Sequence, residues 1–513
     1  MPKALSIPPS RPITPPGGSV RRAGFAGETL SGTAVSVSDG FIRTLEGICQ
    51  VRVDEDTLFD FARDWWPLGM VWATTGRVAR LPAAVVTPAT VAELSAILAL
   101  CNEAGIPVTA AGGRSGVLGN SLPVFGGVVV DCTQLSGIAD LREDDLVVDV
   151  AAGTFGDVFE TTLQEAGYTV GHWPQSMSLS TIGGWIACRG AGQMSSRYGT
   201  VADMTLGVTA VLADGRVIDT SDYSHSATGP DLTQLFVGSE GTLGIITSAR
   251  LHMWPRPGHS RGAAFGFASF ADGVAAIRRF MRRGATPAVV RLYDQVESRR
   301  NFDLPDYCVL LLHDEGDAAI VDGGWAAVIA ECDGVDLGTG PLNQWLSHRN
   351  EVSALDDLIL DRAPDTLEVT APWSRVVDIY EKTTAALSAV SGTRTATAHI
   401  SHAYPDRVGL YFMFGGRPER DERPGWYRQA WDAATAAVLA NGGNLSHHHG
   451  VGLGRGRFMR QALGTSFGVL ETVKGALDPN GILNPGKLGL PSRFGATPVW
   501  SDDITAEPGP DRR

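Results

Sequence analysis

The chain has few cysteines, and none of them form a Cys-X-X-Cys pair. Six are scattered over 513 residues, at Cys49, Cys101, Cys132, Cys188, Cys308 and Cys332. This spacing favours buried free thiols in a reducing compartment over a disulfide framework or a zinc site. We therefore expect a cytoplasmic protein.

Long apolar runs and an excess of positive charge are also missing. The first residues, MPKALSIPPSRPITPPGG, contain no apolar core of signal-peptide length, and no run approaches the roughly 20 apolar residues of a membrane helix. We expect neither secretion by that route nor a membrane span, while peripheral membrane contact stays open. The formal charge is −14. Because nucleic-acid binding depends on many Lys and Arg side chains, no nucleic-acid partner is expected.

The apolar pattern predicts an α+β protein with more than one domain, because the chain exceeds the size of one hydrophobic core. Thr90 and Glu93 form a capping box before a helix that ends at Gly105. Further expected helices cover residues 54–66 and 157–166, and expected strands cover 106–110, 127–131 and 146–150. From about residue 257 longer alternations, at 307–313 and 409–414, predict a second α+β domain.

Three stretches rich in Gly, Ser and Thr carry the first chemical signal: TAAGGRSG (109–116), PQSMSLSTIGGW (174–185) and GSEGTLGII (238–246). Glycines after a strand let backbone N–H groups approach phosphate oxygens, and hydroxyls supply further hydrogen bonds. The first stretch alone fits an ordinary turn equally well, but three in one region are hard to explain as turns. The fingerprint GxGxxG is absent, and GILNPGKL (481–488) lacks the Ser or Thr of a phosphate loop.

These stretches, over about residues 86–257, resemble the FAD-binding fold of the vanillyl-alcohol oxidase type. The resemblance implies an α+β fold, with a two-part FAD-binding domain and an α+β cap (substrate) domain. It implies cofactor contacts from Ala111, Gly112, Gly113, Arg114, Ser115, Gly116, Pro174, Ser176, Met177, Ser180, Thr181, Gly183, Gly184, Arg189, Ala191, Glu240, Gly241, Thr242, Gly244, Ile245, Ile246 and Asn484.

The expected domains follow from this resemblance. The predicted parts are a disordered Pro-rich N-terminus (1–25), a helical segment (26–82), the FAD-binding domain (83–257), the cap domain (258–440), a segment returning to the flavin (441–495) and a disordered tail (496–513). Relatives that bind flavin covalently through the pyrophosphate loop carry a His there, and this chain has none. We therefore expect non-covalent FAD, without excluding a link elsewhere.

Further motifs resemble one branch, the alkyl-dihydroxyacetonephosphate synthases: ARDWWPL (62–68), VRLYD (290–294), TLEVTAPW (366–373), HISH (399–402), LYF (410–412) and SHHHGVG (446–452). Relatives that oxidise 2-hydroxy acids usually show EHGIG and a HAGDGN-like strand, which are absent here. The synthases exchange the acyl group of an acylated dihydroxyacetone phosphate for a fatty alcohol at the flavin N5. The resemblance implies an acid/base role for Tyr411, substrate orientation and proton shuttling by His447, His448 and His449, and positive charge from Arg291.

Structural alternatives accompany these roles. Tyr411 could be a core aromatic of its strand. The three histidines could bind a metal, but adjacent side chains are expected to diverge and no acidic or Cys partner lies at ligand spacing, so no metal is expected. The stretch that matches the arginine for the substrate phosphate in the synthases, SALDDL (353–358), contains no arginine and carries Asp356 instead. Either Arg349 or Arg362 takes its place, or the substrate carries no phosphate there.

Three functions therefore stand: a synthase-like flavoenzyme, an FAD oxidoreductase acting on an alcohol or 2-hydroxy acid, and a flavin-binding protein without catalysis. A small-molecule or lipid-like substrate is expected, and a homodimer stays open.

Overall fold

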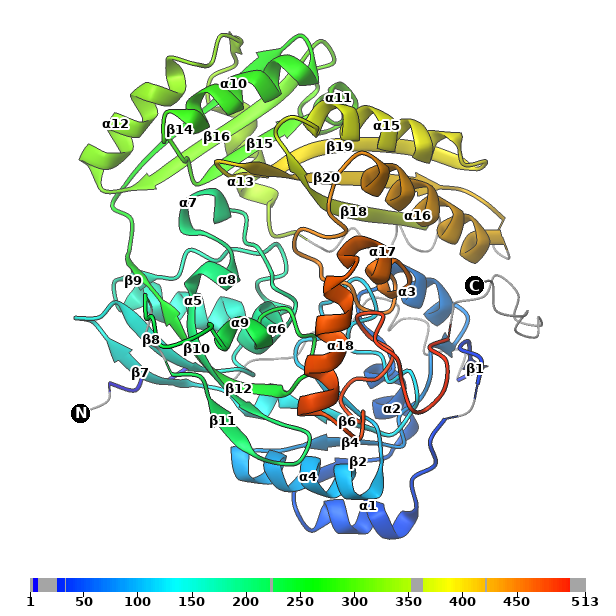
Figure 1. Cartoon of the computed structure of the whole chain (residues 1–513). Helices are drawn as coiled ribbons and strands as arrows, with labels where there is room; N and C mark the ends of the chain where they lie inside the picture. Colours follow the sequence, from blue (N-terminus) through cyan, green and yellow to red (C-terminus); the bar gives the residue numbers. More distant parts are fainter. Residues whose placement is uncertain are drawn as a thin grey trace.

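The computed structural model describes residues 3–7, 25–32, 34–221, 225–351, 363–419 and 422–498. Two sheets lie in the lower part of the molecule and a large sheet covered by helices lies above them (Figure 1). The two outer faces of this arrangement are helical, and the segment after residue 440 lies between the parts (Figure 1). The arrangement confirms the predicted α+β class.

The first sheet has four strands in the order β2-β4-β6-β5. The strands are β2 (Gln50–Arg52), β4 (Ala84–Thr87), β6 (Val128–Asp131) and β5 (Val108–Ala111). β4, β6 and β5 are parallel, and β2 is antiparallel to β4. Helix α4 (Val91–Ala104) lies below this sheet together with α1 (Asp39–Glu46) (Figure 1).

The ends of α4 confirm its N-cap and its C-terminal glycine, but the predicted capping box is only half formed, because the Glu93 carboxylate accepts the Ala89 N–H at 2.8 Å and not that of Thr90. Thr90 caps the helix by accepting a hydrogen bond from the Glu93 backbone N–H at 3.1 Å. Gly105 ends it in a left-handed conformation, with a φ of 65°. The predicted helix over residues 54–66 is too long, because α2 (Glu55–Phe61) stops and α3 (Pro67–Ala73) begins anew. Proline cannot occupy a helix interior, and the residue before it adopts extended backbone.

The second sheet has five antiparallel strands in the order β11-β10-β12-β8-β7. The strands are β7 (Ile138–Arg142), β8 (Val147–Ala151), β10 (Thr205–Val211), β11 (Val217–Asp219) and β12 (Ile245–His252). The helices of this part are α5 (Gly156–Glu165), α6 (Ile182–Ala187), α7 (Ser195–Tyr198), α8 (Val201–Met204) and α9 (Thr233–Phe236). Two short pairs complete it: β1 (Gly27–Glu28) with β3 (Arg77–Val78), and β9 (Tyr168–Thr169) with β13 (Trp254–Pro255).

The third sheet has seven antiparallel strands in the order β17-β14-β16-β15-β19-β20-β18. They are β14 (His259–Phe267), β15 (Val289–Tyr293), β16 (Cys308–Gly316), β17 (Val335–Asp336), β18 (Ala363–Pro372), β19 (Thr393–Ala403) and β20 (Arg407–Gly416). The associated helices are α10 (Phe270–Arg282), α11 (Gln295–Phe302), α12 (Ala318–Ile329), α13 (Gly340–His348), α15 (Val376–Ala389) and α16 (Arg423–Ala440).

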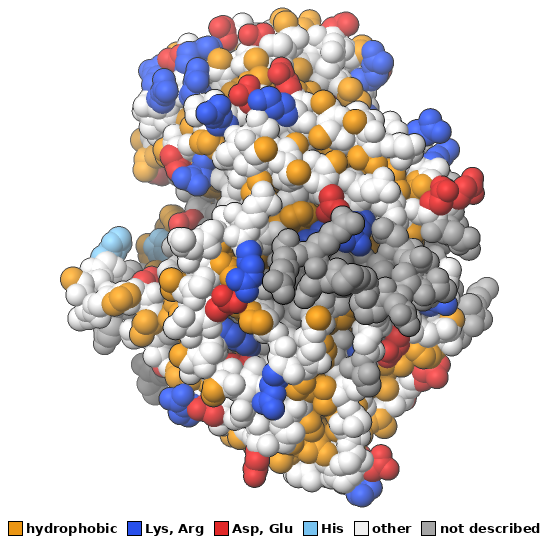
Figure 2. All heavy atoms as spheres, turned by 45° about the vertical axis from the view of Figure 1, so that its right-hand side comes forward, with side chains coloured by type: hydrophobic (Ala, Val, Ile, Leu, Met, Phe, Trp, Pro, Cys, Tyr) orange, Lys and Arg blue, Asp and Glu red, His pale blue; other side chains and the backbone are white. Residues whose placement is uncertain are grey.

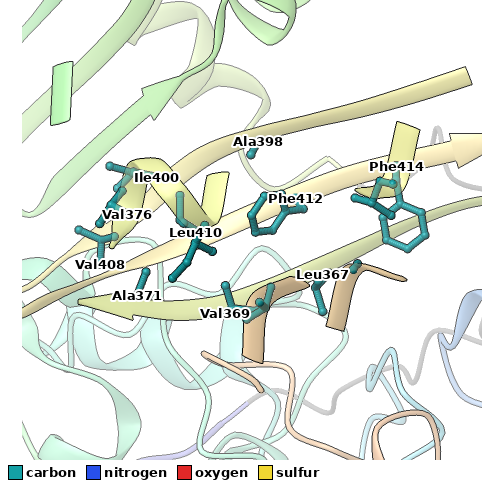
Figure 3. Packing of buried hydrophobic residues seen from close by; sticks show 14 of the residues in the cluster. Leu367, Val369, Ala371, Val376, Ala398, Ile400, Val408, Leu410, Phe412 and Phe414 are labelled. Atoms are coloured by element: carbon teal, nitrogen blue, oxygen red, sulfur yellow. The ribbon is translucent and has the colours of Figure 1, made fainter. Parts of the chain in front are cut away.

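Alternation along the central strands separates an apolar core from a polar face. Leu410, Phe412 and Phe414 of β20 are buried in one cluster with Leu367 and Val369 of β18 (Figure 3). Because side chains of a strand point alternately to opposite faces, the residues between them point away from this core. The opposite face of the sheet is thereby free to carry polar side chains toward the lower sheets.

The C-terminal part, with α17 (Met459–Leu463) and α18 (Ser466–Leu477), contacts the first sheet. The Val108 N–H donates to the Ile482 carbonyl at 2.8 Å, and the Asn484 N–H donates to the Val108 carbonyl at 2.7 Å. In the described ranges, every helix is too short or too polar to cross a membrane. On the face in Figure 2, basic and acidic side chains are interspersed.

Candidate functional site

One cavity of about 900 Å³ lies between the lower sheets and the polar face of the upper sheet. The predicted cofactor residues that line it are Ala111, Gly112, Gly113, Arg114, Ser115, Gly116, Pro174, Ser176, Ser180, Thr181, Gly183, Gly184, Ala191, Glu240, Gly241, Gly244, Ile245 and Ile246. From the upper part, Arg291, Arg349, Tyr411, His448 and His449 line the same space. The fold thus brings together three distant stretches of the sequence and the predicted reactive side chains.

The two adjacent glycines allow the first two stretches to touch through their backbones. A Cβ atom on Gly113 would lie 1.9 Å from the Leu179 carbonyl oxygen, and one on Gly112 would lie 2.3 Å from Thr181 Oγ1. A larger residue at Gly113 would force the Leu179 backbone to shift, and one at Gly112 would force the Thr181 side chain to move. The loop therefore presents main-chain groups to the cavity.

Four predicted cofactor residues lie beside the cavity wall instead of in it. Met177 is in the apolar core, and the Arg189 guanidinium donates to Gln234 at 3.1 Å. The Thr242 hydroxyl donates to the Ser239 carbonyl at 2.7 Å, and the Asn484 amide donates to the Glu240 carbonyl at 2.6 Å. These contacts shape the loops that line the cavity. The guanidinium of Arg114 lies 4.2 Å from the ring centre of Phe61, so its side chain also supports the loop.

His172 was not predicted from the sequence, and it provides the clearest test of whether a polar cofactor fits. It lines the cavity and is fully buried, and its ring centre lies 4.5 Å from that of Trp185. Neither ring nitrogen has a hydrogen-bond partner among the described residues. Because buried polar atoms are nearly always paired, these nitrogens call for a polar ligand in the cavity. With the exposed main-chain groups of the glycine loop, the residues present fit FAD.

Tyr411 faces the cavity because it alternates with the core residues of β20. Its hydroxyl donates to Thr366 Oγ1 at 3.2 Å, and its ring stacks on His399 with 5.0 Å between ring centres. The ring centre of His448 lies 5.9 Å from that of Tyr411. Burial raises the pKa of Tyr411 to about 12, so the hydroxyl keeps its proton at neutral pH. Tyr411 therefore lies half-buried on the cavity wall, outside the apolar cluster that contains Leu410 and Phe412.

The carboxylate of Glu368 in β18 holds the histidine loop from the upper side. It accepts backbone N–H groups from His447, His448 and His449 at 3.2, 3.1 and 2.8 Å. The side chains of Glu368 and Arg455 form a fully buried ion pair. Burial opposes ionisation of Glu368, but Arg455 and His449 hold its pKa well below the usual range. The loop is therefore fixed by its main chain to a charged anchor.

Glu240 holds the next residues of the same loop from the lower side. Its carboxylate accepts the Val451 N–H at 2.6 Å and the Gly452 N–H at 2.8 Å. Burial raises the pKa of this carboxyl, while the two backbone N–H groups act in the opposite direction. The histidine loop is thus bound by one carboxylate from each half of the molecule.

The side chains of the adjacent histidines were expected to diverge, but those of His447 and His448 lie side by side. His447 Nδ1 lies 2.7 Å from His448 Nδ1, and the ligand atoms of His402, His447 and His448 all lie within 4.8 Å of one another. Both nitrogens of His402 already have partners, Ser401 Oγ at 2.8 Å and the Gly192 carbonyl at 2.8 Å. Of the three predicted histidines, His448 and His449 line the cavity and His447 lies behind them.

Two arginines give the cavity positive charge. Arg291 lies 2.7 Å from His399 Nε2 through Nη2 and donates from Nε to the Tyr293 hydroxyl at 3.0 Å. Arg349 donates to Gln193 at 3.3 Å, and burial lowers its pKa. Within the part of the chain that the structure describes, neither guanidinium has a carboxylate within 4.0 Å. The other two predicted substrate residues, Asp356 and Arg362, lie outside the described residues.

Three cavity residues of β19 were quoted in a motif but not assigned a role: His399, Ser401 and His402. Alternation explains the first two. A register shift between Ile400 and His402 explains why His402 also reaches the cavity, because a bulge re-aims the side chain that follows it. Two histidines in one alternating strand were a usable sequence signal for a polar site. The bulge itself left no signal in the sequence.

Comparison with known proteins agrees with this geometry. Residues 82–221 match the family model described as FAD binding domain. Residues 256–488 match the model described as FAD linked oxidases, C-terminal domain. The fold and the cavity define a flavoprotein of the FAD-binding, vanillyl-alcohol oxidase type.

Proteins of similar sequence and structure identify the family of this chain. The chain is 30% identical over 441 residues to the uncharacterized FAD-linked oxidoreductase YgcU of Escherichia coli K12, covering 80% of this chain and 89% of that protein. It is 27% identical over 455 residues to alkyldihydroxyacetonephosphate synthase of Dictyostelium discoideum, covering 80% and 74%. A solved structure of alkyldihydroxyacetonephosphate synthase superposes with a TM-score of 0.76 at 21% identity, covering 93% and 90%. The chain belongs to the FAD-linked oxidoreductase family.

Proposed function

We propose that this protein is an FAD-dependent enzyme of the alkyl-dihydroxyacetonephosphate synthase type, which exchanges a group on a phosphorylated, lipid-like substrate. One observation carries the proposal: Tyr411, His448 and two arginines all line the same cavity. Guanidinium groups that have no carboxylate within 4.0 Å among the described residues favour an anionic substrate group, because Arg binds phosphate and carboxylate through paired donors.

The residues of the cavity have separate roles in binding the substrate and in transferring protons. Bound FAD supplies a nucleophilic or redox-active flavin ring. Arg349 and Arg291 hold the anionic end of the substrate and fix its orientation. Burial lowers the pKa of His448 well below its usual range, so the ring is neutral and accepts a proton at Nε2. Tyr411 keeps its proton at neutral pH and donates a hydrogen bond to a substrate oxygen.

Oxidation of a 2-hydroxy acid is the second candidate, and the same arginines favour it. A carboxylate suits a pair of guanidinium groups as well as a phosphate does. A neutral histidine would then take the hydroxyl proton of the substrate. The two reactions differ in their need for an electron acceptor, which makes them separable by experiment.

The test uses the purified FAD-loaded protein under anaerobic conditions. We expect ether product from an acylated dihydroxyacetone phosphate and a long-chain alcohol, with no electron acceptor present and with the flavin spectrum unchanged at the end. Mass spectrometry of the lipid product measures this. Absence of product, combined with bleaching of the flavin by a 2-hydroxy acid, would replace the first function with the second.

Tyr411→Phe refines the same experiment. The variant keeps the ring that stacks on His399 but loses the hydroxyl that bonds to Thr366. We expect it to bind FAD normally and to lose about 10² to 10⁴ in turnover, the usual contribution of a general acid. Activity within a few-fold of the parent would show that Tyr411 is only a packing residue.

A further inference from the structure

Arg291 is connected to a buried carboxylate through a single imidazole ring. The Nη2 atom of Arg291, in β15, lies 2.7 Å from His399 Nε2. On the other side of the ring, His399 Nδ1 lies 2.8 Å from Glu297 Oε2. The three side chains therefore form a row, in which a ring from β19 separates a cation of β15 from an anion of α11.

This row determines which nitrogen of His399 carries the proton. A guanidinium group can only donate hydrogen bonds, so His399 Nε2 has to accept. The ring proton then lies on Nδ1 and donates to the Glu297 carboxylate. A second ring proton would place two positively charged donors 2.7 Å apart. Burial lowers the pKa of His399 and Arg291 acts in the same direction, while Glu297 opposes them. The ring is therefore neutral at pH 7.

Glu297 is held in place behind the ring by several contacts. Its side chain is fully buried, and Oε1 accepts the Thr397 hydroxyl at 2.7 Å. Its backbone N–H donates to Asp294, the N-cap of α11, at 2.8 Å. Burial opposes ionisation of Glu297, but His399 and Arg300 hold its pKa below the usual range. The carboxylate is therefore charged and fixed in position.

Further contacts of Arg291 are with uncharged groups. Its Nε donates to the Tyr293 hydroxyl at 3.0 Å. Its guanidinium carbon lies 5.5 Å from the ring centre of Tyr293 and 5.2 Å from that of Trp345. Both hydrogen bonds use the Nε side of the planar group, and neither requires the Nη1 nitrogen. These partners set the orientation of the guanidinium without neutralising its charge, and Arg binds anions through such paired donors.

We propose that His399 is a positioning residue for Arg291, because it gives the guanidinium a fixed acceptor and keeps the Glu297 carboxylate one ring away. Arg291 then stays charged and oriented for the anionic group of the substrate. The inference deepens the proposed function and rests on it, since Arg291 there holds the anionic end. It applies to both candidate reactions, because phosphate and carboxylate use the same donors. Direct contact with Glu297 would instead place a negative charge where the substrate anion has to bind.

The alternative is that His399 only packs, because its ring stacks on Tyr411 with 5.0 Å between the ring centres. Two substitutions separate these roles, since each keeps the hydrogen bond of one ring nitrogen. The amide of His399→Asn replaces Nδ1 as the donor to Glu297 but does not reach Arg291. The longer side chain of His399→Gln replaces Nε2 as the acceptor for Arg291 but leaves Glu297 without this partner.

The test measures anion binding and stability separately. Calorimetry of the FAD-loaded protein gives the dissociation constants of glycerol 3-phosphate and of oxalate, one probe for each candidate anion. Urea unfolding of the FAD-free protein gives the midpoint. We expect His399→Asn to weaken anion binding by about tenfold or more, the scale of a lost hydrogen bond to a charged group, and to unfold near the parent midpoint. His399→Gln should bind the anion within a few-fold of the parent but unfold at lower urea, because a buried carboxylate loses a partner.

His252→Asn is the matched control. His252 is a half-buried histidine of β12 that bonds to the Leu146 carbonyl at 3.2 Å, away from Arg291, so anion binding should be unchanged. Anion binding that is unchanged in His399→Asn, or equally weakened in both His399 variants, would overturn the inference and leave the proposed function intact. A parent that binds neither anion would contradict the proposed function itself and overturn this inference with it.

Discussion

His172 is a buried histidine whose protonation opposes folding. Burial lowers its pKa from 6.5 to about 3. The unfolded chain therefore binds a proton at higher pH than the folded one does, and stability falls as the pH drops from 6.5 toward 3. The fold keeps this ring neutral by excluding water.

His172→Phe should remove this acid sensitivity while keeping a ring against Trp185. At pH 5 the neutral ring costs the parent about 2 kcal/mol relative to pH 7, from about 1.4 kcal/mol for each unit between 6.5 and 5. We expect the variant to lose about 2 kcal/mol less than the parent between these pH values. Urea unfolding of the FAD-free proteins measures the difference. His225→Asn, at an exposed position, is the control. Identical pH profiles for His172→Phe and the parent would contradict the assignment.

At the level of single residues, the sequence predicted the positions whose role depends on local chemistry. Gly112 and Gly113 directly follow a strand and leave no room for a side chain. Two adjacent glycines after a predicted strand are visible in the sequence itself. The role of His172 depends on the absence of partners, and a lone histidine between Gly171 and Trp173 reveals nothing about its partners. That information exists only after the chain has folded.

Strand β18 carries its most important charge in the middle of an apolar alternation. Glu368 lies between Leu367 and Val369, is fully buried, and pairs with the equally buried Arg455. Such a pair does little for net stability compared with apolar residues, but removal of one partner leaves a buried charge unpaired. The element therefore depends on both charges being present.

Glu368→Gln should lower the free energy of unfolding by about 3 to 5 kcal/mol, the usual cost of breaking a buried pair. Asp219→Asn breaks the pair with Arg250, whose carboxylate side is 51% exposed, and should cost less than about 1 kcal/mol. Urea unfolding of both variants at saturating FAD gives the comparison. Equal losses would show that Glu368 is not an anchor.

The sequence predicted elements well where a local signal sets both ends. Helix α4 begins at the N-cap Thr90 and ends at a left-handed glycine, and both residues were readable in the sequence. The predicted helix over residues 54–66 ran too far, because α2 ends at Phe61 although the apolar spacing continues to Trp66. Asp64 instead accepts the Trp66 N–H at 3.1 Å, in a turn that leads to the start of α3 at Pro67. The bulge in β19 depends on pairing with β20, which no local pattern contains.

At the scale of the whole molecule, the two halves meet around the cavity, so a ligand there contacts both. We expect the purified protein to be yellow and acid denaturation to release FAD into the supernatant. Added FAD should also raise the midpoint of thermal unfolding, because a ligand at 100 times its Kd stabilises the folded state by about 2.7 kcal/mol. Flavin that stays with the acid precipitate would contradict non-covalent binding. A colourless protein that FAD cannot reconstitute would contradict the cofactor itself.

The attachment of the histidine loop bears on how this fold acquires new activities. Glu368 and Glu240 grip main-chain N–H groups, which every residue except proline possesses. Substitution of His448 therefore leaves both anchors in place. The loop keeps its backbone position whichever side chains face the cavity, so these side chains are interchangeable. Evolution, or a library randomised at this position, can exchange the reactive group without rebuilding the scaffold that aims it.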